Sequence, residues 1–96
     1  MDIRKKLEYI FTMPRVFELD GYKFFFFSNE GNPLEEPCHI HVRKSENLAK
    51  FWILDSAILA DNYGFSATEL AKIKNIANDN ITLIKETWNE FFSGKC

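Results

Sequence analysis

The chain has 96 residues, of which 46% are hydrophobic and 27% charged, a composition typical of one globular domain that excludes a disordered or low-complexity protein. Its formal net charge of −2 excludes an overall basic surface of the kind that binds nucleic acid without regard to sequence. A basic binding surface must therefore be local, and residues 39–50 supply one, with Arg43, Lys44 and Lys50 against Glu46.

Residues 1–12 predict a short N-terminal helix. Apolar residues recur there at helical spacing, and the helix must end before Pro14, because the residue before a proline is disfavoured in the α region. We expect this segment to be an extension that precedes a single domain formed by residues 13–96.

Residues 15–54 predict an antiparallel sheet built from two hairpins. Runs of β-branched and aromatic residues separated by turn residues are typical of strands. Four such runs are RVFEL at 15–19, YKFFFFS at 22–28, HIHVRK at 39–44 and LAKFWIL at 48–54. The dipeptide DG predicts a tight turn in the first hairpin, residues 29–37 predict an irregular surface loop, and SEN predicts the turn of the second hairpin.

The remaining sequence changes to a helical period. Asp55 predicts the cap of a short helix through Asn62, with Gly64 just past its end. SATE at 66–69 is a capping box that opens a long amphipathic helix to about Phe92, and NIANDN favours a break in its middle. The expected fold is therefore α+β, an antiparallel four-stranded sheet with a long C-terminal helix packed on one face and a short N-terminal helix.

Strand parity places both histidines on one face of this sheet. Side chains alternate between the two faces, so Ile40 and Val42 face the long helix and the intervening residues face away from it. This requires an even number of residues between the strands of the second hairpin, or a bulge, because a plain three-residue turn would reverse one strand. The predicted histidine face then contains His39, His41, Arg43, Lys50 and Trp52.

The two cysteines, Cys38 and Cys96, have no metal-type spacing and are predicted to be free, reduced thiols. The N-terminal segment MDIRKKLEYIF lacks the apolar run and cleavage site of a signal peptide, and no apolar run approaches the length of a membrane span. We therefore expect a cytoplasmic protein with no membrane partner.

Several segments together resemble one known family. The strings MPRVFELDGYKFFFFSNEGNPLEEPCHIHVRK, AKFWILD, NYGFSATELAKI and WNEFF are similar to the bacterial domain-of-unknown-function family 4160 (DUF4160) over about residues 13–92. The resemblance implies no established activity. It does imply genes that are paired with a second small gene, as in toxin–antitoxin modules, and hence a small cognate protein as partner and an RNA target.

The histidine face suggests a metal-independent ribonuclease of the toxin type. Such a reaction needs a base for the 2′-hydroxyl proton and an acid for the leaving oxygen, and imidazole, whose usual pKa is near neutrality, can fill both roles. His39 and His41 are the candidate catalytic base and acid, with no cofactor. The candidate ligand-binding residues are Arg43 and Lys50 for phosphate, and Trp52 or Tyr22 for base stacking.

Two other hypotheses stay open. His-x-His on a strand can chelate a metal, but two ligands are too few, and a third would have to come from a loop carboxylate: Glu30, Glu35, Glu36 or Asp55. Alternatively, the protein is not catalytic, and its Phe-rich strand and histidine face bind the paired small protein. A homodimer is also compatible with the sequence. In the simplest case the two histidines are solvated polar residues and the phenylalanine rings belong to the core.

Overall fold

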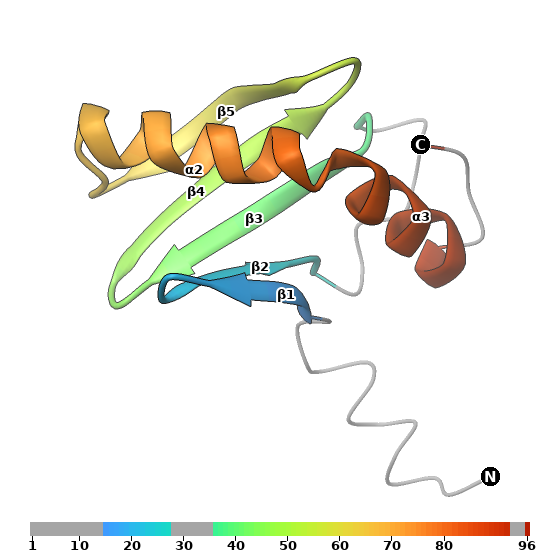
Figure 1. The fold of residues 1–96 in the computed structure, drawn as a ribbon, viewed down its shortest axis with the longest axis horizontal. Helices are drawn as coiled ribbons and strands as arrows, with labels where there is room; N and C mark the ends of the chain where they lie inside the picture. Colours follow the sequence, from blue (N-terminus) through green and yellow to red (C-terminus); the bar gives the residue numbers. More distant parts are fainter. Residues whose placement is uncertain (1–14, 28–35, 93–95) are drawn as a thin grey trace, which may run out of the picture.

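An antiparallel sheet followed by two helices forms the described part of the chain. The computed structural model describes residues 15–27, 36–92 and 96, so the predicted helix of residues 1–12 lies outside the described residues. The described sheet has five strands that lie in chain order, and Figure 1 shows their arrangement. The elements are β1 (Arg15–Leu19), β2 (Tyr22–Phe25), β3 (His39–Lys44), β4 (Asn47–Ile53), β5 (Ala57–Tyr63), α2 (Ala67–Asp79) and α3 (Ile81–Phe92). The α+β class is confirmed, with five strands instead of the predicted four.

Two short turns fix the register within each hairpin, that of β1 with β2 and that of β3 with β4. Asp20 and Gly21 both have positive φ, 52° and 82°, which is the backbone of a two-residue hairpin turn of type I′. The second turn also has two residues, because Lys44 pairs with Asn47, and not the three of SEN. The even number satisfies the parity condition, so the apolar residues of β3 and β4 share one face.

Residues 57–63 form a strand, so the predicted helix from Asp55 to Asn62 is wrong. The segment turns back directly after β4, with Ile53 opposite Ala57, and pairs with β4 as far as Tyr63. A helix of about two turns is marginal in water, whereas a strand beside β4 satisfies its backbone groups at once. Gly64, with φ of 99°, ends this strand and not a helix.

The long C-terminal helix is broken in two. Its start is as predicted, since Ser66 accepts from the Glu69 backbone N–H and the Glu69 side chain accepts from the Ser66 N–H, which makes a complete capping box. The break falls at Asn80, whose backbone N–H and side-chain amide both donate to the Ile76 carbonyl, the latter at 2.9 Å. Figure 1 shows α2 lying across one face of the sheet and α3 beyond the end of the sheet.

The core lies between α2 and the face of the sheet that α2 covers. Its largest fully buried side chains come from β2, β3 and β4 and from both helices: Phe24, Ile40, Val42, Phe51, Ile53, Ile73 and Ile84. Phe17 of β1 stacks on Phe24, with ring centroids 4.3 Å apart. Beyond β2, Phe26 is buried edge-on against Trp88 of α3, with centroids 5.2 Å apart. Much of the aromatic content of the chain therefore lies in this core.

Cys38 and Cys96 form a disulfide, with Cα atoms 5.5 Å apart, so the prediction of two free thiols is wrong. The two residues are separated by 58 positions, and nothing in their spacing indicates that Cys96 lies beside the start of β3. The structure also bears on membrane insertion: among the described residues, neither helix has the length and apolar character needed to span a bilayer.

Candidate functional site

The sheet face opposite α2 carries the predicted site. Cross-strand pairing arranges its side chains in three rows, and we call these residues together the open face. The first row, from β1 to β5, is Glu18, Lys23, Arg43, Leu48 and Tyr63. The second row is Arg15, Phe25, His41, Lys50 and Asp61. The third row, from β3 to β5, is His39, Trp52 and Ile58.

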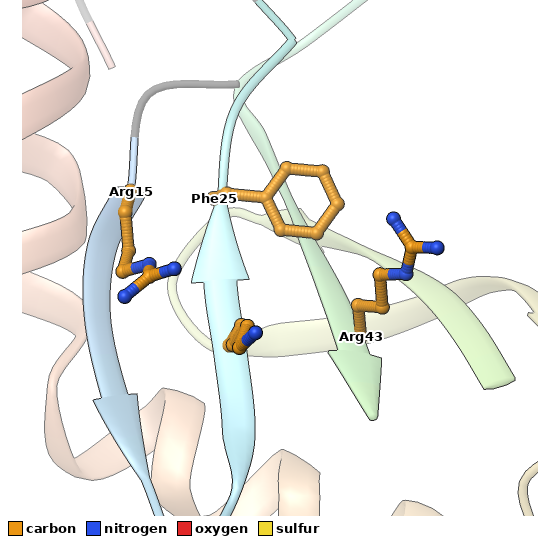
Figure 2. Close-up of a pocket in the computed structure, with 4 residues that line it drawn as sticks. Arg15, Phe25 and Arg43 are labelled. Carbon is orange, nitrogen blue, oxygen red and sulfur yellow. The ribbon is translucent and has the colours of Figure 1, made fainter. Parts of the chain in front are cut away.

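Three cations gather at one end of the open face. Lys23 lies directly opposite Arg43, and Arg15 lies opposite Phe25 in the next row. With Phe25 they line a depression of about 150 Å³, which we call the basic pocket. Figure 2 shows the Phe25 ring extending from β2 toward β3, between Arg15 on β1 and Arg43 on β3. This volume is below the roughly 300 Å³ typical of pockets that enclose an organic ligand, and suits a single anionic group.

Like charges placed directly opposite each other across two strands destabilise a sheet, so the Lys23–Arg43 pair needs an explanation. One carboxylate is near: Glu18 pairs with Lys23 across the strands and lies 3.4 Å from Arg15. Because the side chains of Glu18 and Arg15 are 43% and 57% exposed, their ion pair contributes at most about 1 kcal/mol. The cluster therefore keeps an excess of positive charge.

The positive surface continues past the basic pocket toward the tips of the two hairpins. A second, more open depression of about 460 Å³ adjoins the first and shares two of its cations. It is lined by Gly21, Lys23, Arg43, Lys44 and Ser45. Because Lys23 and Arg43 line both depressions, an anionic chain could pass from one to the other along these two residues.

His39 is on the predicted side of the sheet but is fully buried, at 0% exposure. Its ring packs edge-on against Trp88 of α3, with centroids 5.2 Å apart, and against Trp52 at 5.8 Å. Nδ1 lies 2.9 Å from the Pro37 carbonyl oxygen, which can only accept, so the proton is on Nδ1. Nε2 lies 3.8 Å from the carboxylate of Glu36. The expected solvent-facing position of this ring is wrong, because α3 reaches around the end of the sheet.

His41 is also buried, at 6% exposure. Its ring stacks with Phe25 at 5.6 Å and meets the edge of Phe27 at 4.4 Å. The two imidazoles are 5.2 Å apart and perpendicular. Parity is thus confirmed, while in this conformation a substrate has no access to His39. A general base must come within hydrogen-bonding reach of the proton it removes, so the catalytic roles of the pair remain a prediction.

The predicted ligand-binding residues are not all together. Arg43 lines the basic pocket. Lys50 instead donates to both carboxylate oxygens of Glu36, at 2.7 and 2.9 Å, and its ammonium lies 4.5 Å over the ring of Trp52. Tyr22 lies on the opposite face, 2% exposed and covered by the ammonium of Lys44 at 4.6 Å. Lys50 and Trp52 are therefore engaged with each other, and Tyr22 does not belong to the open face.

Sequence reasoning missed several residues of the open face, among them Arg15, Lys23 and Tyr63. Tyr63 is 64% exposed and ends the row that contains Lys23 and Arg43. The DG turn contained the signal for Lys23, because a two-residue hairpin sets the parity of β2 relative to β1. Tyr63 could not be found in this way, since its strand was predicted as a helix.

The described residues contain no group of three or more His, Cys, Asp and Glu side chains that could hold a metal ion. Glu36 approaches His39, but it does so as the partner of Lys50. His39 lies beside Glu36 and packs against two tryptophan rings, and His41 packs against Phe25 and Phe27. This arrangement differs from the open three-ligand geometry of a catalytic metal centre.

Comparison with known families gives one match. The model of a family described as "Domain of unknown function (DUF4160)" matches residues 21–89, which is more than half of the chain. The match runs from β2 into α3 and leaves Arg15 of β1 outside it. It confirms the resemblance found in the sequence. No curated protein and no solved structure matches the chain.

Proposed function

Because the chain belongs to the DUF4160 family, whose description names no activity, we propose a function from its own surface: the open face binds single-stranded RNA. The observation that carries the proposal is the Lys23–Arg43 pair, two cations set directly opposite each other with Arg15 beside them. A sheet gains nothing from such a pair by itself, and a phosphate placed between the two cations converts repulsion into attraction.

The same row supplies a surface for a base. Tyr63 lies two strands from Arg43, which is about 10 Å, and its ring is 64% exposed. Leu48 lies between them as an apolar floor. Single-stranded RNA is commonly held in this way on a sheet, by stacking of bases on aromatic rings and by cations along the backbone.

Binding, and not cleavage, is the function that this geometry supports best. Both imidazoles are enclosed by aromatic rings, and their packing holds Phe25 and Trp52 in place beside the cations. In the paired arrangement that the family resemblance implies, the protein would be the RNA-binding member and a small cognate protein its partner. A ribonuclease would need α3 to move away from His39.

A matched pair of variants tests the proposal. Arg43→Gln and Lys74→Gln each remove one charge, the first from the basic pocket and the second from the exposed surface of α2. We expect Arg43→Gln to weaken the binding of a labelled oligouridylate, measured by fluorescence anisotropy, by roughly five- to tenfold. It should also lower the slope of log affinity against log salt by about 0.7, the value for one phosphate on a single strand.

Lys74→Gln should leave affinity and slope unchanged. Equal effects of the two substitutions would contradict the proposal, because the attraction would then be a property of total charge. The same samples, run on a gel, also test for a nuclease: cutting of the RNA that is lost in His41→Gln would replace binding with catalysis as the function.

A further inference from the structure

β5 has the features of an edge that receives another strand. It is the last strand on its side of the described sheet, and Figure 1 shows it outermost. Ile58, Leu59 and Tyr63 are 44%, 42% and 64% exposed. Exposed edges are usually protected by lysine, proline or a covering segment. β5 contains no lysine or proline, and its single charged residue is Asp61.

Within the described residues, α2 protects the first residue of this edge. The Ala57 backbone N–H donates to Oδ1 of Asn78 in α2, at 2.7 Å, and the Ala57 side chain is buried. From Ile58 to Asp61 every side chain is exposed. An incoming strand can therefore align beside these residues without displacing a described contact of α2 with Ala57.

A β-bulge in β5 determines which of its side chains would lie beside an incoming strand on the open face. Lys50 pairs with Asp61 and Phe51 with Leu59, so Ala60 is an extra residue. As a result Ile58, Asp61 and Tyr63 lie on the same face, although 58 and 61 differ by an odd number. An added strand would place three of its own side chains opposite these residues. The side chains opposite Ile58 and Tyr63 would be apolar, and a central side chain would lie opposite Asp61.

The charge of Asp61 determines which kind of residue fits opposite it in the incoming strand. The cross-strand neighbour of Asp61 is Lys50, whose ammonium is already held by both carboxylate oxygens of Glu36. The carboxylate of Asp61 accepts a hydrogen bond from the Asn62 N–H at 3.0 Å, which does not neutralise it. A lysine or arginine directly opposite Asp61 would do so, and opposite charges in such pairs stabilise a sheet.

A second copy of the chain fits this edge poorly. Among antiparallel pairings of two β5 strands with matching faces, the one with the longest overlap places Ile58 opposite Tyr63 and Ala60 opposite Asp61, which brings the two Asp61 carboxylates together near the twofold axis. Like charges in that position are destabilising. We infer that β5 receives an extended strand of a different protein, with a basic residue opposite Asp61 and apolar residues two positions to either side.

Two peptides test this inference with the full chain. The first is Thr-Val-Thr-Lys-Thr-Val-Thr, and the second has Glu in place of Lys. We expect the Lys peptide to protect the amides of β5 from hydrogen exchange and to bind at least roughly fivefold more tightly than the Glu peptide. Asp61→Lys should reverse the preference, whereas Asp79→Lys, an equivalent change at an exposed position of α2, should not. Equal binding of the two peptides, or protection that excludes β5, overturns the inference.

Other outcomes are equally decisive. If β5 amides are protected without peptide and sedimentation shows a dimer, the occupant is a second copy and the inference is wrong. Leu59→Pro removes an N–H that points to the free edge, because residue 59 alternates with residue 57, whose N–H points away from β4 to Asn78; it should abolish peptide binding and leave the binding of RNA intact. Arg43→Gln should weaken the binding of RNA and leave peptide binding intact. The strand site and the RNA site therefore fail separately.

Discussion

Lys23 and Arg43 share the open face because the apolar neighbours of each go to the core, and the pairing of β2 with β3 sets them opposite each other. The turn at Asp20 and Gly21 sets Lys23 on the open face, and the turn after Lys44 sets Arg43 on the same face. Each turn has an even number of residues, so the apolar neighbours go to the core as a group. At the residue scale, the position of the cations thus follows from the same chemistry that builds the core.

His39 is the residue whose predicted role the structure changes most. Parity alone indicates its side of the sheet, and parity was right. Burial depends on Trp88, which is 49 positions further along the chain, and no local pattern indicates that α3 covers this end of the sheet. An imidazole with 0% exposure, held by the Pro37 carbonyl and two tryptophan rings, is part of the packing.

His39→Ala should therefore destabilise the fold by about 2–4 kcal/mol, because it leaves a cavity between β3 and α3 and removes the partner of the Pro37 carbonyl. Urea unfolding followed by tryptophan fluorescence measures the change. Thr82→Ala, at an exposed position of α3, is the control and should change stability by less than about 0.5 kcal/mol. A His39→Ala protein as stable as the control would mean that the ring is solvated, as the sequence first indicated.

At the scale of elements, β1 to β4 could be predicted and β5 could not. The segment between Asp55 and Gly64 has no alternation of polar and apolar residues, and these two end residues resemble the caps of a helix. Its strand conformation is determined by the free edge of β4, a tertiary effect that outweighs weak local preference. The break at Asn80 was predictable from the asparagines around it, but the direction taken by α3 after the break was not.

The link between β5 and α2 depends on Gly64. Its φ of 99° is strained for any residue with a Cβ, and a Cβ there would collide with the side-chain oxygen of Asn47. Gly21, with φ of 82°, would meet only the flexible end of Lys44, at 3.3 Å. We expect Gly64→Ala to lower the free energy of unfolding by at least about 1 kcal/mol more than Gly21→Ala does. Similar values for the two, from urea titrations, would show that the contact with Asn47 is readily relieved.

At the scale of the whole molecule, the net charge gives no indication of the surface to which we assign RNA binding. A net charge of −2 argues against nucleic acid as a ligand, yet pairing of three strands brings Arg15, Lys23 and Arg43 around one depression. The sequence indicated Arg43 and the side on which it lies. The DG turn contained the signal for the face of Lys23, but the proximity of Arg15 and Lys23 to Arg43 depends on the sheet as a whole. Local density of charge, and not its sum, decides whether a face attracts phosphate.

The most direct measurement of the central claim is an NMR titration of the ¹⁵N-labelled full chain with oligouridylate RNA. If the open face binds RNA, the largest amide shifts will lie at Lys23, Arg43, Leu48 and Tyr63, they will weaken as salt is raised, and Lys74 and Asn75 on the exposed surface of α2 will not shift. Shifts that are largest on α2, or no shifts at all at high RNA concentration, would contradict the account.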